Sequence, residues 1–213
     1  ERPDYVVMWG WGVMNQVAVQ EAANIRFPMD HFIGNWWAGA EHDVTPAGEA
    51  ADGYLSLNMN GVGDLPVLDE IRTHVIDAGM GAGDGSNVGS VLYIRGMYAA
   101  MLAAEAAATA QEMHGEANIT AAMMRDGMEA LNITEERMVE LGMPGVGPAF
   151  EVSCANHGGP GMGRIQQWNA ADQRWVTVTD FIAPDDSVTQ PLIEEDSAAF
   201  AAENNITPRD CGM

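Results

Sequence analysis

The first sixty residues alternate between short apolar runs and segments with helical spacing. The apolar runs at residues 5–9, 31–34 and 53–58 are typical of buried strands. Between them, residues 14–25 place apolar side chains three and four positions apart, and a short helix is expected at 43–50. This order of strand, helix, strand, helix and strand predicts an α/β fold with a doubly wound sheet.

The pattern is almost entirely helical over residues 64–146. Four helices are predicted there, at residues 66–79, 91–114, 121–131 and 135–141. The last two follow Thr120 and Thr134, whose side chains are common N-caps, and Gly115 ends the longest one. The chain therefore divides into a strand-rich part and a helical part.

Strand patterns return after this helical part. A strand is predicted at 150–153, a hairpin at 164–169 and 174–182, and a short acidic helix at 193–204. Two glycine clusters remain, at 79–85 and 158–163. The first follows a helix and lacks the spacing of a dinucleotide fingerprint, and the second lies between strands, so both are interpreted as loops.

Charge excludes several classes of function. The 213 residues contain nine basic side chains, all arginine, against 31 acidic ones, a formal net charge of −22. Nucleic-acid binding needs a basic surface that neutralises phosphates, and an anionic membrane surface would repel this chain. Because 47% of the residues are apolar, the chain can nevertheless bury a core.

No membrane-spanning or targeting segment is predicted. The most apolar long stretch, residues 91–110, contains Arg95 and Glu105, so it is interpreted as a helix of a soluble protein. The first residues do not resemble a signal peptide, and the chain starts as if in the middle of a longer one.

Cys154 and Cys211 are the only cysteines. They lack the spacing of zinc ligands, and a nucleophilic pair of Cys154 with His157 has no neighbouring group to orient the histidine. A disulfide between them is favoured over both, and it would indicate an oxidising compartment. The five histidines are scattered without metal-ligand spacing, so no metal, cofactor or catalytic dyad is expected.

Four tryptophans form the main candidate for a binding site. Trp9 and Trp11 follow the first predicted strand, and Trp36 and Trp37 follow the second. Ligands of open parallel sheets bind beyond the carboxyl ends of the strands, and indoles there would form an apolar pocket with N–H donors. The alternative is that these rings are half-buried core residues that close the end of the sheet.

Charged and phenolic side chains nearby are secondary candidates. Glu41 and Asp43 would either bind a ligand ammonium or lie in solvent. Tyr93 and Tyr98 flank Arg95 at the start of the longest helix. Because an unpaired buried charge is costly, Arg95 is expected to bind either a structural acid or a ligand carboxylate.

Six segments together resemble the branched-chain-amino-acid-type periplasmic substrate-binding proteins of ABC transporters. They are 5–15 (YVVMWGWGVMN), 32–41 (FIGNWWAGAE), 91–96 (VLYIRG), 152–158 (VSCANHG), 164–168 (RIQQW) and 204–211 (NNITPRDC). The resemblance implies two Rossmann-like lobes that close on a ligand by a hinge motion. Residues 1–58 and 148–213 would belong to the C-terminal lobe, and 64–146 would be a helical return segment of the N-terminal lobe.

The resemblance also implies a function. The chain would be an extracytoplasmic solute-binding component, periplasmic or extracellular and not an enzyme, that delivers a small solute to a membrane permease. The residues expected to face the ligand are Trp9, Trp11, Trp36, Trp37, Glu41, Tyr93 and Tyr98. Members of the family carry a carboxylate after the second strand, where this chain has Trp36. The expected ligand, amino-acid-like in the family, is therefore shifted toward an amide or an aromatic or aliphatic acid.

One departure from the family leaves an alternative open. Family members are nearly twice as long, and the part absent here corresponds to their first half. The chain is then either a fragment that needs its N-terminal half, or a truncated relative. In the second case it would not bind solute, and it would associate with itself or with another chain through an apolar surface.

Overall fold

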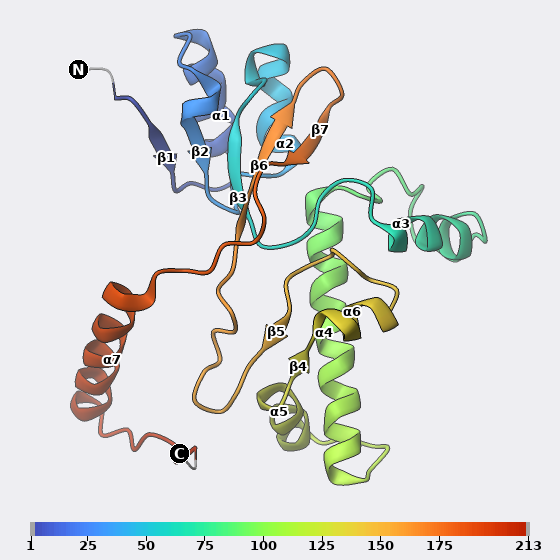
Figure 1. Cartoon of the computed structure of the whole chain (residues 1–213), viewed down its shortest axis with the longest axis vertical. Helices are drawn as coiled ribbons and strands as arrows, with labels where there is room; N and C mark the ends of the chain where they lie inside the picture. The colour runs from blue at the N-terminus through green and yellow to red at the C-terminus, as the bar shows by residue number, and fades with distance from the viewer. Residues whose placement is uncertain (1–2, 212–213) are drawn as a thin grey trace.

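A five-stranded sheet forms one end of the molecule in the computed structural model, which describes residues 3–211 (Figure 1). Its strand order is β1-β2-β3-β6-β7. The strands are β1 (Val6–Met8), β2 (Phe32–Gly34), β3 (Leu55–Asn58), β6 (Arg164–Asn169) and β7 (Arg174–Thr177). The first three are parallel, whereas β6 and β7 run antiparallel to their neighbours. The α/β prediction is confirmed, and the hairpin makes the sheet mixed instead of wholly parallel.

Helices α1 (Val13–Asn24) and α2 (Glu41–Val44) pack together beside this sheet, with two 3₁₀ segments, Met29–His31 and Thr45–Ala51. Their apolar side chains share one core with the strands. Its buried members include Val19, Phe32, Val44, Tyr54, Trp168 and Trp175. Two of the six tryptophans therefore stabilise the hairpin side of the core and do not face solvent.

The helical part contains α3 (Pro66–Ile71), a π-helical turn (Arg72–Ile76), α4 (Val91–His114), α5 (Ala121–Glu129) and α6 (Glu135–Glu140). The predicted N-caps are confirmed, because Thr120 accepts from the Met123 amide and Thr134 from the Arg137 amide. Gly115 ends α4 with a φ of 66°, a left-handed conformation that glycine adopts readily. A second core joins these helices, with Leu68, Ile94, Met101, Leu131 and Met138 among its members.

A small antiparallel sheet lies within this helical part. Strand β4 (Asn132–Ile133) pairs with β5 (Phe150–Glu151). The sequence predicted β5 but not β4, because a two-residue strand is too short to produce an alternating pattern. The boundary between the two predicted lobes at residue 148 stays a prediction. Strand β5 lies just after this boundary and pairs with β4, which lies before it.

Helix α7 (Asp186–Glu203) stands apart from the other helices (Figure 1) and contains no buried residue. It begins seven residues before the predicted start, because the Asp185 carboxylate accepts from the Ser187 amide at its N-terminus. Pro191 lies inside it without ending it. A Cys154–Cys211 disulfide, as predicted, ties the tail beyond α7 to the loop after β5.

Helix α4 is long and apolar enough to cross a membrane by length and composition alone. In the structure it packs against α5 and places Ile94, Met101, Ala106 and Ala110 in the interior. Two of its polar side chains also have partners, because Arg95 bonds the loop after β2 and Glu105 forms an ion pair with Arg137. These contacts bury one side of α4, and most of its residues stay outside the interior.

Candidate functional site

The two tryptophan pairs begin at the same edge of the sheet. In the parallel register of β1 and β2, Met8 lies opposite Gly34, so both strands end together. The Asn35 amide donates to the Met8 carbonyl at 3.0 Å, which continues the pairing for one more residue. The β1–α1 and β2–α2 junctions are therefore neighbours at the carboxyl edge.

The four indoles contact one another across these junctions. The ring centroids of Trp9 and Trp36 are 5.2 Å apart, those of Trp11 and Trp37 5.1 Å, and those of Trp36 and Trp37 5.9 Å. Trp9, Trp11 and Trp37 remain 71%, 60% and 46% exposed. The rings thus form one apolar surface open to solvent, which we call the tryptophan cluster. They do not lie in the interior of the sheet.

Buried polar side chains hold the loop that carries Trp36 and Trp37. The Asn15 Nδ2 group, on the first turn of α1, donates to the Trp37 carbonyl at 2.6 Å and to Asp43 Oδ1 at 3.1 Å. The Trp37 amide donates to Asn35 Oδ1 at 3.0 Å, and the Ala40 amide donates to Asp43 Oδ2 at 3.0 Å. Asp43 is buried, so it neither lies in solvent nor is open to a ligand ammonium.

Sequence reasoning missed Asn15 and Asn35. Both are buried polar residues at the ends of apolar elements. Asn15 lies four positions before the buried Val19 on α1, and a polar residue on the apolar face of a helix was the one available signal. Asn35 had no such signal, because its role depends on how the chain turns after β2.

Glu41 connects the sheet to the helical part. Its two carboxylate oxygens lie 3.1 and 3.3 Å from the Val91 amide nitrogen, which donates to them at the N-terminus of α4. The positive end of the helix dipole favours a carboxylate at this place. Figure 1 shows this end of α4 close to the edge where β3 ends. The Glu41 carboxylate is thus already engaged by the protein.

Arg95 makes a second connection from α4. Its Nη2 group donates to the Trp36 carbonyl at 2.8 Å. Burial lowers the pKa of the guanidinium, and the nearby Asp43 carboxylate acts in the opposite direction. Arg95 therefore contacts the backbone of the loop that carries Trp36 and Trp37.

The structure separates the two candidate tyrosines. Tyr93 lines a hollow of about 600 Å³, together with Glu41, His42, Ser86, Asn87, Ser90 and Leu92. Tyr98 packs edge-on against Phe150 at 6.5 Å, and its hydroxyl donates to the Pro148 carbonyl at 3.1 Å. Burial raises the pKa of Tyr98 to about 12. Tyr93 lies at the Glu41 contact, whereas Tyr98 packs on the core of the helical part.

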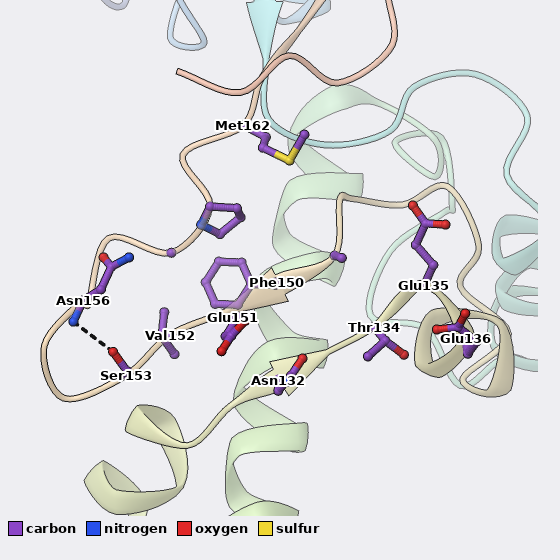
Figure 2. A pocket seen from close by; sticks show the side chains of 13 residues that line it. Asn132, Thr134, Glu135, Glu136, Phe150, Glu151, Val152, Ser153, Asn156 and Met162 are labelled. Carbon is purple, nitrogen blue, oxygen red and sulfur yellow. Dashed lines mark hydrogen bonds between the residues drawn. The ribbon is translucent and has the colours of Figure 1, made fainter. Parts of the chain in front are cut away.

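A larger hollow, of about 660 Å³, lies beside β4 and β5 and was not predicted. Figure 2 shows Asn132, Phe150 and Glu151 from the two strands, with Glu135 and Glu136 from the start of α6. Across residues 3–211, the structure brings together no group of three or more histidine, cysteine, aspartate or glutamate side chains that could hold a metal ion.

Comparison with known proteins gave matches only among solved structures; no protein-family model and no curated protein matches the chain. One structure, described as an ABC transporter permease from the Pseudomonas fluorescens group, is 39% identical with a TM-score of 0.91. The match covers 99% of this chain and 51% of that one.

Two further structures share the fold at lower identity. A branched-chain amino acid ABC transporter protein from Thermus thermophilus with bound valine is 22% identical, with a TM-score of 0.63; 85% of this chain and 46% of that one are covered. A leucine-binding protein from Thermotoga maritima is 14% identical, with a TM-score of 0.58, and 86% and 46% are covered. These neighbours are transport proteins, not enzymes.

The chain spans about half the length of the structures that it matches. The resemblance found in the sequence is confirmed: this chain is similar over 99% of its residues to about half of the Pseudomonas structure, and over 83–86% to about half of solved ABC transporter substrate-binding proteins of the leucine/isoleucine/valine-binding type.

Proposed function

We propose that the chain is part of an extracytoplasmic solute-binding component of an ABC transporter, and that its solute binds at the tryptophan cluster. The observation that carries this proposal is the meeting of four indoles from two neighbouring strand–helix junctions. Carboxyl edges of parallel strands are where open α/β sheets bind ligands. Indole rings supply flat apolar contact area together with an N–H donor.

Several features of the cluster support binding over core packing. A ring that packs in the core is largely buried, yet three of these rings are about half or more exposed. The backbone of Trp36 and Trp37 is held by Asn15, Asn35 and Arg95, which fixes the loop that carries these two rings before a ligand arrives. A contiguous exposed apolar patch marks an interaction site, and a preorganised site loses less conformational freedom on binding.

The proposed protein partner is suggested by the matched structures, because this chain covers only about half of each of them. We propose that the remaining half of such a receptor packs on the helical part and on α7. Helix α7 carries four apolar side chains that are each more than half exposed, Val188, Leu192, Ile193 and Phe200. The helical part, 64–146, would then belong to the N-terminal lobe, and residues 1–58 and 148–213 to the C-terminal lobe. A periplasmic or extracellular location and a membrane permease as acceptor belong to the same proposal.

The binding site is tested by truncating the indoles. The chain is titrated with benzoate and with benzamide, and binding is measured by calorimetry. Trp11→Ala and Trp36→Ala are each expected to weaken the binding of these probes about tenfold, because each removes a stacked ring. Phe200→Ala, an exposed aromatic on α7, is the matched control and is expected to change nothing. Unchanged affinity in both tryptophan variants would contradict the assignment of the binding site to the tryptophan cluster.

A further inference from the structure

Polar side chains occupy one buried face of β3 and β6. Ser56 and Gln166 lie opposite each other in the antiparallel register of these strands, so their side chains point to the same side of the sheet. Asn58 shares that side, because it follows Ser56 by two positions. All three residues are buried. Burying a polar group is costly unless it forms hydrogen bonds, so these side chains need partners.

Two of these side chains bond the loop after β2, residues 35–40, which we call the tryptophan loop. The Gln166 Nε2 group donates to the Gly39 carbonyl at 2.7 Å, and the Ser56 hydroxyl donates to the Asn35 carbonyl at 3.0 Å. A Cβ on Gly39 would collide with the Ser56 hydroxyl. The tryptophan loop therefore lies directly on the polar face of β3 and β6.

Gln166 also bonds the point where the chain leaves the sheet. Its Oε1 accepts from Asn58 Nδ2 at 2.8 Å. Asn58 ends β3, and its own Oδ1 accepts from the amide of the next residue at 2.9 Å. Residues 59–63, which we call the crossover, connect β3 to the helical part. Within the crossover, the Gly61 amide donates to the Val146 carbonyl at 2.6 Å, at the end of the helical part.

The amide of Gln166 thus fixes how two distant segments lie relative to each other. Its nitrogen donates to the tryptophan loop, 127 residues away in sequence, and its oxygen accepts from Asn58, 108 residues away. Fully bonded buried polar groups specify one arrangement more strictly than apolar packing does, because a shifted arrangement leaves a buried group unpaired. A displaced crossover would therefore cost a hydrogen bond unless the tryptophan loop moves with it.

We propose that Gln166 is a positioning residue for the tryptophan cluster, and that it couples the tryptophan loop to the crossover. This inference rests on the proposed function and deepens it, because it names a residue that sets the position of Trp36 and Trp37. Gln166 is buried, so it acts through the loop and does not touch a solute. Because the crossover leads to the helical part, the positions of the helical part and of these two rings change together.

The positioning role is tested by amide hydrogen exchange in the chain without a ligand. Gln166→Met keeps the length of the side chain and removes both hydrogen bonds of the amide. The Trp37 and Ala40 amides, which donate to side-chain oxygens, report the opening of the tryptophan loop. Their exchange is expected to rise about tenfold, because opening no longer breaks the bond to the Gly39 carbonyl.

Gln167→Met provides the matched control. Gln167 is the next residue of β6, points to the other side of the sheet and donates to the Gly53 carbonyl at 3.2 Å. This variant should leave exchange in the tryptophan loop unchanged. The Trp168 amide, which donates to the Tyr54 carbonyl inside the sheet, reports general unfolding and should stay protected in both variants. Unchanged loop exchange in Gln166→Met, or an equal rise at Trp168, overturns the positioning role.

Asn58→Ala tests the coupling to the crossover. Among the hydrogen bonds of the described residues, those of the Asn58 side chain reach Gln166 and the crossover but not the tryptophan loop. Asn58→Ala is nevertheless expected to raise loop exchange about threefold, and to add nothing when Gln166 is already methionine, because the effect passes through Gln166. No rise in the otherwise wild-type chain, or the same rise in both backgrounds, overturns the coupling.

Probe binding separates this inference from the proposed function. Gln166→Met is expected to weaken the binding of benzoate about threefold to tenfold, because a loop that is fixed beforehand loses less freedom on binding. Gln167→Met should leave this affinity unchanged. Loop exchange that rises without a loss of benzoate affinity overturns the role of Gln166 in binding. If the wild-type chain binds neither benzoate nor benzamide, the proposed function fails, whereas the exchange results still decide whether Gln166 holds the loop.

Discussion

Tyr98 shows how a single side chain serves two purposes in the helical core. Its ring packs against Phe150, while its hydroxyl reaches the Pro148 carbonyl and so satisfies a polar group where the chain approaches β5. A Cβ on Gly147 would lie only 2.5 Å from the Tyr98 ring, so any larger residue at that position would force the ring to shift. The residue thereby fixes the path of the chain from α6 to β5.

This burial gives Tyr98 a measurable effect on stability at high pH. The folded chain holds the pKa of Tyr98 at about 12, whereas the unfolded chain has the ordinary value of about 10. Between these values the unfolded state binds fewer protons, so the free energy of unfolding falls as the pH rises through this range. The stabilisation is fully present below pH 10.

Tyr98→Phe is expected to reduce this pH dependence and to lower stability near pH 7 by about 1 kcal/mol, through loss of the hydrogen bond to Pro148. Urea unfolding at pH 7 and at several pH values above 10 measures both the stability at pH 7 and its dependence on pH. Part of the dependence will remain, because burial also raises the pKa of Tyr54. Tyr5→Phe, at an exposed position, is the control; equal slopes for Tyr98→Phe and wild type would contradict the burial of this hydroxyl.

At the scale of elements, the contact between α2 and α4 joins the two parts of the molecule. Glu41 accepts the first amide of α4, and Arg95, four residues into that helix, bonds the loop that contains Trp36. A carboxylate at a helix N-terminus contributes roughly 0.3–1 kcal/mol. The tryptophan cluster is thus positioned partly by a helix from the other part of the chain.

Glu41→Gln is therefore expected to lower the free energy of unfolding by about 0.5 to 1 kcal/mol, with a smaller effect at high salt. Thermal melts at low and high ionic strength measure the difference. Glu112→Gln, in the last turn of α4, is the matched control. It removes a negative charge from the negative end of the dipole and is expected to be neutral or slightly stabilising. A loss of stability in both variants would show that the dipole is not the cause.

Elements with a regular pattern could be predicted from the sequence, and those that depend on distant contacts could not. Strands β1, β2 and β3 and helix α4 followed from apolar runs and spacing, with ends marked by caps and glycine. The tryptophans could be placed at one edge, since parallel strands end together. The partner of Glu41 could not be predicted, because Val91 lies 50 residues away in sequence. Strand β4 was missed because a strand of two residues is too short to show an alternating pattern.

At the scale of the whole molecule, two contacts hold the C-terminal tail. The Cys154–Cys211 disulfide attaches it to the loop after β5, and the ion pair of Arg209 with Glu129 attaches it to α5. His157, in the loop after β5, lies against the same glutamate. Helix α7, which precedes this anchor, buries none of its residues. Its exposed apolar side chains form an uncovered surface, where we propose that the other half of the receptor packs.

The most direct test of a shared solute site at the tryptophan cluster is a titration of the ¹⁵N-labelled chain with benzoate, followed through the indole N–H resonances. We predict that the signals of Trp9, Trp11, Trp36 and Trp37 shift together with one dissociation constant. The signals of the buried Trp168 and Trp175 should stay in place. Stationary signals from the four clustered indoles, or shifts confined to the buried pair, would contradict the central claim.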